Sequence, residues 1–174
     1  MKTSVLFIIL ISIPFLAKPQ ARTGVGLNVG AIKPFDDRWK GGQTISLNAD
    51  FRVSNSWAVK LGTGINKLSR GYPSYPNNAI HYTGGMVFLT LEGKYYVKRN
   101  WFATAGLLSY VAGDGGFYGG NAAIFSYGYR ANLDKHFSFD LSPVLYIIKA
   151  NHTAGAIAAA GFTVSLYYSS ALKN

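Results

Sequence analysis

The chain has no cysteine and little charge, and both shortages restrict what it can be. Without cysteine it cannot have a disulfide scaffold, a thiolate metal site or a lipoprotein anchor. Charged residues make up only 14% of the 174 residues, against about 25% in an ordinary soluble domain. The length allows one domain, and no Pro- or Ser-rich linker divides it. These features indicate a single domain whose surface is partly covered by something other than water.

Long apolar runs are also scarce, and the clearest one lies at the N-terminus. Lys2 precedes the apolar residues 4–16, and small and polar residues follow as far as Ala21. This run is shorter than the roughly 20 residues of a membrane-spanning helix, so we interpret residues 1–21 as a signal peptide cleaved after Ala21. An uncleaved anchor helix is the alternative. Cleavage would remove Lys2 and Lys18 from the 17 Lys+Arg residues, leaving 15 against 7 Asp+Glu, a net charge of +8.

The rest of the chain shows alternation of apolar and polar residues with a period of two, which is typical of strands with two unlike faces. In the clearest case, Ile45, Leu47 and Phe51 alternate with Ser46 and Asn48. In the mostly apolar fifth segment the pattern does not separate the two faces. The sequence therefore predicts eight strands, at about residues 24–31, 45–53, 57–65, 81–97, 101–111, 125–131, 137–145 and 162–169.

The connections between these segments alternate in length. Tight polar turns at 54–56, 98–100 and 134–136 separate longer segments at 33–43, 66–80, 112–120 and 150–155. Outer-membrane barrels show this order, with short periplasmic turns and longer extracellular loops. An even strand count also lets the first and last strands pair, so that no backbone edge faces lipid. We therefore predict an all-β fold: one eight-stranded antiparallel up-and-down transmembrane β-barrel over residues 22–174, with both termini periplasmic.

Side-chain volume decides which strand face points outward. In a soluble barrel such as a lipocalin, the apolar face would surround an internal ligand. Here one face carries bulky residues such as Trp57, Phe125, Tyr127 and Phe162, whereas the other is mostly Gly, Ser, Thr, Asn and Ala. The interior of an eight-stranded barrel is only just wide enough for side chains to fill. We therefore expect the bulky apolar face to point outward and the small polar face inward.

Several charged residues lie on the small polar face, and opposite charges in a narrow lumen are stable only when paired. We predict a lumenal salt-bridge network that plugs the barrel and fixes strand register. A conducting pore is the competing use of these residues, but eight strands leave no aqueous channel. The predicted network contains Asp50, Arg52, Lys60, Glu92, Lys94, Arg130 and Asp140.

Two further sets of residues are predicted to face the membrane boundary. An aromatic residue follows each of the three short turns: Trp57, Trp101 and Phe137. Aromatic rings are favoured at the boundary between membrane and water, so we predict that these three lie at the membrane interface. Basic residues in the first two long loops could contact lipopolysaccharide phosphates. A solvated loop surface is the alternative for this basic set, Lys33, Arg38, Lys40, Lys67 and Arg70. Nucleic acid is excluded as a partner because the basic residues are scattered and the chain is predicted to be exported.

No catalytic, cofactor or metal site is predicted. His81, His136 and His152 lack a local Ser/Asp motif, and no H-E-x-x-H spacing occurs. The Gly-rich segment 114–120 is followed by neither the Lys-Ser/Thr pair nor the helix of a phosphate-binding loop.

Residues 88–97, 101–106, 126–130 and 137–140 together resemble the small outer-membrane β-barrel domain proteins common in Bacteroidota, which are related in shape to OmpX/OmpA-type barrels. The resemblance covers roughly residues 22–170 and implies a fold and a location, with no catalytic residue to transfer. The chain departs from such barrels by continuing past Tyr168 instead of ending on an aromatic residue. We expect a non-enzymatic barrel with a structural or surface-interaction role that contacts outer-membrane lipid and lipopolysaccharide. An accessory subunit of a larger outer-membrane complex and a lipid A-modifying enzyme are the alternatives.

Overall fold

The computed structural model describes residues 23–36, 39–71, 81–98, 100–113, 120–150 and 156–169, except the side chains of 39–40, 69–71, 81–83 and 150. The predicted signal peptide lies outside these residues. Within the described part of the chain, no helix is long and apolar enough to cross a membrane. The strands, in chain order, are β1 (Thr23–Pro34), β2 (Trp39–Arg52), β3 (Trp57–Gly71), β4 (His81–Tyr96), β5 (Trp101–Gly113), β6 (Gly120–Asn132), β7 (Phe137–Ala150) and β8 (Ile157–Ser169).

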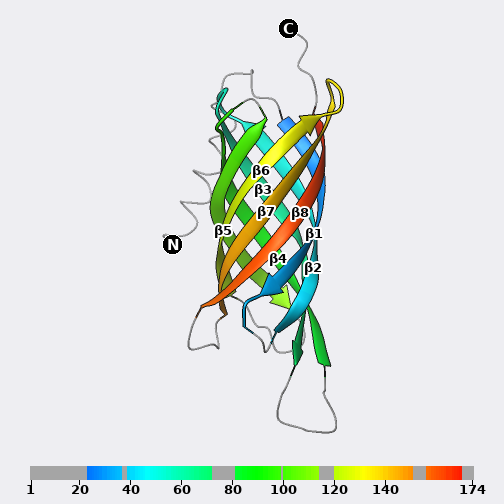
Figure 1. The fold of residues 1–174 in the computed structure, drawn as a ribbon, viewed down its shortest axis with the longest axis vertical. Coiled ribbons are helices and arrows are strands. Elements are labelled where there is room, and N and C mark those ends of the chain that lie inside the picture. Colours follow the sequence, from blue (N-terminus) through cyan, green and yellow to red (C-terminus); the bar gives the residue numbers. More distant parts are fainter. Residues whose placement is uncertain are drawn as a thin grey trace.

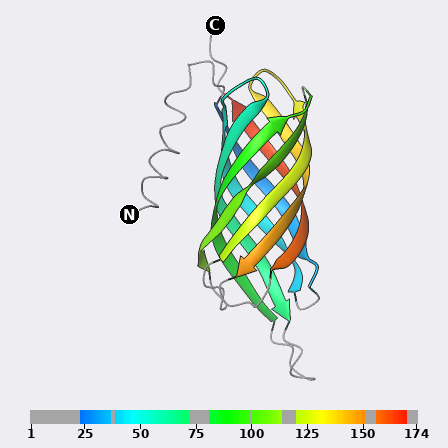
Figure 2. The same cartoon turned by 90° about the vertical axis from the view of Figure 1, so that its left-hand side faces the viewer.

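These strands form one closed barrel in which each strand pairs with its sequence neighbours (Figures 1 and 2). All pairs are antiparallel, and β1 closes the sheet against β8 in a register that places Val29 opposite Val164. Closure leaves no strand edge, so the ladder satisfies backbone N–H and C=O groups around the whole circumference. The predicted closed eight-stranded antiparallel barrel is confirmed.

The two ends of the barrel differ, as the turn pattern predicts. The three short connections, from β2 to β3, from β4 to β5 and from β6 to β7, lie at one end, together with the start of β1 and the end of β8 (Figure 1). Gly24 pairs with Ser169 there, and the Ser169 N–H donates to the carbonyl of His136 at 2.8 Å. We refer to this end as the short-turn end and to the other as the long-loop end.

The strands extend farther toward the long-loop end than the alternation predicts. β1 reaches Pro34 and β2 begins at Trp39, so most of the predicted 33–43 loop is strand. β3 and β4 have 15 and 16 residues, against the roughly 9–11 that cross a bilayer, and their paired ends project beyond the rim (Figure 1). The difference arises because backbone pairing continues where side-chain alternation has already faded.

The outward face of the barrel is apolar, as expected from side-chain volume. Its exposed residues include Leu27, Leu47, Leu107, Phe125 and Leu166, which lie on five different strands. A water-soluble protein seldom exposes a continuous apolar surface of this extent. The outer face therefore suits an apolar surrounding better than water.

The inner face carries the expected small polar residues, but large apolar and aromatic side chains, which the side-chain volumes did not predict there, share it. Toward the long-loop end the lumen holds an apolar cluster that includes Phe88, Leu108, Tyr110 and Tyr146. Tyr167 is buried as well, and a Cβ at Gly26 would lie 2.5 Å from its ring. Glycines and other small residues on the inner face therefore leave room that large rings from neighbouring strands occupy.

Candidate functional site

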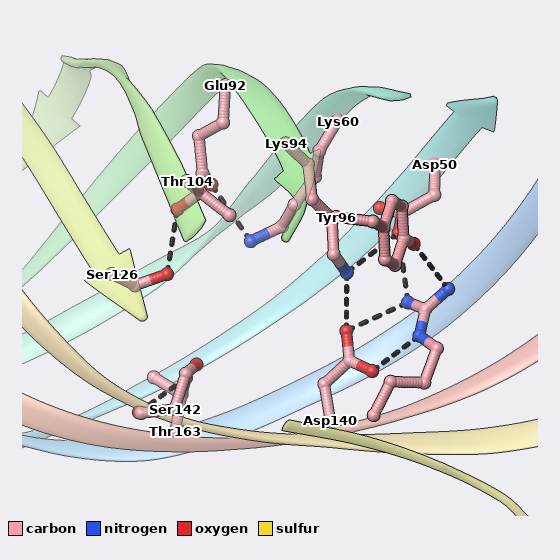
Figure 3. A network of polar contacts seen from close by, with 11 residues as sticks. Asp50, Lys60, Glu92, Lys94, Tyr96, Thr104, Ser126, Asp140, Ser142 and Thr163 are labelled. Atoms are coloured by element: carbon pink, nitrogen blue, oxygen red, sulfur yellow. Dashed lines mark hydrogen bonds and ion pairs between the residues drawn. The ribbon is translucent and has the colours of Figure 1, made fainter. Parts of the chain in front are cut away.

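A cluster of four charged side chains lies inside the barrel (Figure 3), on the strand segments nearer the short-turn end. Lys94 of β4 lies between two carboxylates, with its Nζ 3.2 Å from Asp50 Oδ2 of β2 and 2.5 Å from Asp140 Oδ2 of β7. Arg130 of β6 binds Asp140 in a bidentate manner, through Nε at 2.6 Å and Nη2 at 2.8 Å. Its Nη2 also contacts Asp50 Oδ2 at 3.1 Å. We refer to Asp50, Lys94, Arg130 and Asp140 as the central cluster; it links four strands.

Aromatic rings surround the two cations of the central cluster. The Lys94 Nζ lies 4.0 Å from the centre of the Phe102 ring, and the Arg130 guanidinium lies 4.8 Å from that of Tyr167. The Tyr96 hydroxyl accepts a hydrogen bond of 2.9 Å from Arg130 Nη1. Ring faces attract cations, and this attraction is stronger where water is excluded. The Lys94 side chain is only 1% exposed, so its charge is compensated by these neighbours and not by solvent.

A second ion pair lies in the lumen beside the central cluster. Lys60 Nζ is 2.9 Å from Glu92 Oε1, and the Thr104 hydroxyl donates to Glu92 Oε2 at 3.0 Å. Because Thr104 has a single hydroxyl proton, the 2.7 Å contact between Thr104 and Ser126 requires Ser126 to be the donor. Together the two groups bring three carboxylates and three cations into the lumen, so their formal charges cancel.

The central cluster divides the space inside the barrel. A cavity of about 490 Å³ opens at the short-turn end, and Asp50, Tyr96 and Arg130 contribute to its lining. A second cavity of about 30 Å³ is lined by Asn28, Thr90 and the Lys60–Glu92 pair. The cavity at the short-turn end is large enough for a small solute. The second cavity, which we call the inner cavity, has room for only one or two water molecules.

Six of the seven predicted lumenal residues belong to these ion pairs, and Arg52 is the exception. Its side chain is half-buried and donates to the carbonyls of Ser54 at 3.3 Å and Asn55 at 2.6 Å. The guanidinium stacks 4.6 Å from the centre of the Tyr96 ring. Among the described residues, no carboxylate pairs with Arg52. Its position at the end of β2 explains this difference, because the turn carbonyls are nearer than the carboxylates of the lumen.

Trp57, Trp101 and Phe137 are each the first residue of a strand, and each is exposed on the outer face. Each ring packs on an aromatic neighbour of the adjoining strand. Trp101 stacks on Tyr127 with a centroid distance of 5.5 Å, Trp57 lies 4.8 Å from Tyr95, and Phe137 lies 5.3 Å from Tyr168. These pairs form an aromatic row near the short-turn end.

The predicted basic set lies on strands where the structure describes it. Lys33 of β1 and Lys67 of β3 are exposed outer residues toward the long-loop end. Lys40 and Arg70 belong to β2 and β3, but their side chains are not described, and Arg38 lies outside the described residues. The sequence predicted loops here because the alternation of apolar and polar residues ends before the strands do.

Neither a protein family nor a curated protein sequence matches the chain. Solved structures do match it. Neisserial surface protein A has a TM-score of 0.62 at 11% identity, over 84% of this chain and 96% of that one. The attachment invasion locus protein Ail of Yersinia pestis has a TM-score of 0.53 at 11% identity, over 86% and 99%. The outer membrane protein AlkL has a TM-score of 0.51 at 14% identity, over 89% and 92%.

The fold is that of a small outer-membrane β-barrel. At these identities the similarity concerns the fold alone. In the part of this barrel that the structure describes, no group of three or more His, Cys, Asp or Glu residues could hold a metal ion.

The described histidine of this barrel, His136, lies in the turn between β6 and β7. Its Nδ1 is 3.2 Å from the Ser169 carbonyl oxygen, and its ring stacks on Tyr168. Asp134 accepts hydrogen bonds from the N–H groups of Phe137 and His136, which lower the pKa of this exposed carboxyl. These contacts stabilise the turn. His152 lies outside the described residues, and the side chain of His81 is not described.

Sequence reasoning missed the groups that complete the network: Tyr96, Phe102, Thr104, Ser126 and Tyr167. Thr104 and Phe102 were missed because the fifth strand did not separate into faces. Tyr167 alternates with the apolar residues of β8, and this parity was a signal for an inward ring.

Proposed function

We propose that this chain is a non-enzymatic integral outer-membrane protein with a structural or surface-interaction role. One observation carries the proposal: the side chains divide into an apolar outer face and a charge-balanced lumen that the central cluster crosses. Such a barrel is stable in lipid, and its closed interior favours a role for the outer surface and rim over transport.

Membrane fractionation tests this proposal. The full chain, expressed in a Gram-negative bacterium, should be exported and found in the outer-membrane fraction, and it should resist extraction by urea or alkaline carbonate. The purified barrel in a planar bilayer should give no stable single-channel steps. A mature chain that stays soluble without detergent would contradict the membrane assignment, and steady conductance would contradict the closed lumen.

We further propose that residues 1–21 act as a cleaved signal peptide and that the short-turn end faces the periplasm. The aromatic row of Trp57, Trp101 and Phe137 would then lie at the periplasmic interface, where such rings are favoured. N-terminal sequencing of the exported protein checks the cleavage, and protease protection of a C-terminal tag in intact cells checks the orientation. The similarity to Bacteroidota-type barrels stays a prediction from the sequence.

In this orientation the long-loop end meets the outer leaflet, and we propose that its basic residues contact lipopolysaccharide. Exposed Lys33 and Lys67 supply positive charge at this end. The structural neighbour Ail has been solved with the heparin analogue sucrose octasulfate, so a barrel of this shape can hold a polyanion. Binding to vesicles that contain lipopolysaccharide should weaken as salt rises, because salt screens contacts between exposed lysines and phosphate.

A further inference from the structure

A groove of about 510 Å³ lies on the outer surface of the barrel, across β1 to β4. Its lining is mainly apolar and includes Leu27, Ile45, Leu47, Ile65 and Val87. The groove exists because the register places Thr63, a small residue, next to Leu47 on one side and Leu89 on the other. Larger side chains around this small one form the walls.

The floor of the groove suits a hydrocarbon chain even though Thr63 is polar. The Thr63 hydroxyl donates to the backbone carbonyl of Phe88 at 3.1 Å. Its hydrogen-bonding capacity as a donor is therefore satisfied within the sheet. An acyl chain lying over Thr63 would not have to bury an unpaired hydroxyl proton.

One end of the groove is polar, at the side of the long loops. Lys67 and Gln43 are direct partners across β2 and β3, and both contribute to the lining. The next outward-facing pair of the same two strands, two positions closer to the short-turn end, is Ile45 and Ile65, which are both apolar. The ammonium of Lys67 and the amide of Gln43 thus lie at one end of the apolar groove. This arrangement is complementary to a lipid that has a phosphate next to its acyl chains.

We propose that this groove binds one acyl chain of lipopolysaccharide, with a phosphate of its lipid A held by Lys67 and Gln43. The inference rests on the proposed function and deepens it, because it assigns the lipid contact to one site. If the groove is a specific site, the acyl chain and the phosphate of the lipid should both contribute to binding. A diffuse positive surface predicts that any exposed lysine at this rim contributes equally.

Two pairs of matched variants separate these cases. Lys67→Gln removes the cation of the groove, and Lys149→Gln removes an exposed cation at the same end of β7, away from the groove. Thr63→Leu fills the floor, and Ala105→Leu adds the same side chain to the exposed face of β5. All four positions face outward, so each variant should fold, which circular dichroism in detergent can verify.

The barrel is reconstituted in phosphatidylcholine vesicles with a minor fraction of lipopolysaccharide, gently extracted, and weighed with its retained lipid by native mass spectrometry. Lys67→Gln should lower retention about fivefold, the effect of one lysine near an anionic lipid surface. Thr63→Leu should also lower it, whereas Lys149→Gln and Ala105→Leu should match the wild type. Deacylated lipopolysaccharide should compete poorly, because it has the phosphates without the chains.

Equal losses for Lys67→Gln and Lys149→Gln would overturn the site in favour of diffuse charge. Full competition by the deacylated form would overturn the role of the acyl chain. Both results leave the membrane assignment intact. Failure of the wild type to insert into the vesicles would instead contradict the proposed function.

Discussion

At the scale of single residues, the central cluster is a case in which burial makes each partner depend on the others. Lys94 contacts two carboxylates, and the side chains of Lys94 and Asp140 are only 1% and 4% exposed, so a lost partner is poorly replaced by solvent. Buried ion pairs add little net stability compared with well-packed apolar groups, but losing one member of a pair is costly. The cluster therefore contributes mainly by specifying which strands face each other across the lumen.

Lys94→Met should lower the free energy of unfolding by about 3–5 kcal/mol, because it leaves two buried carboxylates with one guanidinium. Urea unfolding in detergent micelles, followed by tryptophan fluorescence, measures the change. Arg52→Met is the control: this half-buried side chain contacts two turn carbonyls and the Tyr96 ring, and its loss leaves no buried carboxylate unpaired, so the cost should be smaller, about 1–2 kcal/mol. Equal costs for the two variants would contradict a special role for the central cluster.

Thr90 and Thr104 are both buried, but they differ in hydrogen bonding. The Thr90 hydroxyl has no partner in the described residues, whereas Thr104 donates to Glu92. Thr90→Val should leave stability unchanged or raise it by about 1 kcal/mol, because it removes an unpaired buried hydroxyl. Thr104→Val should cost about 1–3 kcal/mol by leaving a charged acceptor short of a donor. A loss at Thr90 as large as that at Thr104 would mean that its hydroxyl is bound by water in the inner cavity.

At the scale of the strands, small residues determine how closely the ladders approach. Gly93 and Gly106 occupy neighbouring rungs of the β4–β5 pair, opposite Ala105 and Glu92. A Cβ at Gly106 would lie 2.3 Å from the Leu91 carbonyl oxygen and 2.6 Å from Glu92 Cα, both of them backbone atoms. At Gly93 the nearest atom would be 3.8 Å away.

Gly106→Ala should therefore destabilise the barrel by about 1–3 kcal/mol, the usual cost of overpacking. Gly93→Ala should be neutral or should stabilise by about 0.5–1 kcal/mol, because alanine loses less chain entropy on folding. Both changes are measured by the same unfolding titration. A neutral result at Gly106 would show that the two strands can separate without loss.

The strands also show how far sequence reasoning reaches. Period-two alternation predicts the inward and outward faces wherever apolar and polar residues truly alternate, as in β2. It fails in β5, where Leu107 and Leu108 are both apolar although only Leu108 points inward. Arg130 and Asp50 are 80 residues apart, and their contact depends on how the strands are staggered around the closed barrel. Alternation contains no information on this stagger, so the charged residues were predictable but most of their pairings were not.

At the scale of the whole molecule, the medium around the barrel decides whether its fold is stable. The outer face exposes apolar side chains on every strand, while the lumen holds balanced charges and buried rings. In water the exposed apolar outer face would be unfavourable, although the charges of the enclosed lumen are paired. In a bilayer the same distribution becomes favourable, because the outer band is matched by acyl chains and the closed ladder leaves no unpaired backbone edge.

Two exposed leucines allow a direct test of this argument. Leu107 lies in the middle of β5 and is 66% exposed, and Leu133 lies in the β6–β7 turn and is 61% exposed. In water the two sites would be equivalent, so Leu→Arg would be harmless at both. In lipid, Leu107→Arg places a charge near the midplane and should cost about 2–4 kcal/mol, whereas Leu133→Arg at the interface should cost about 0–1 kcal/mol. Reversible urea unfolding from lipid vesicles measures both values. Equal values would mean that water, and not a bilayer, surrounds the strands.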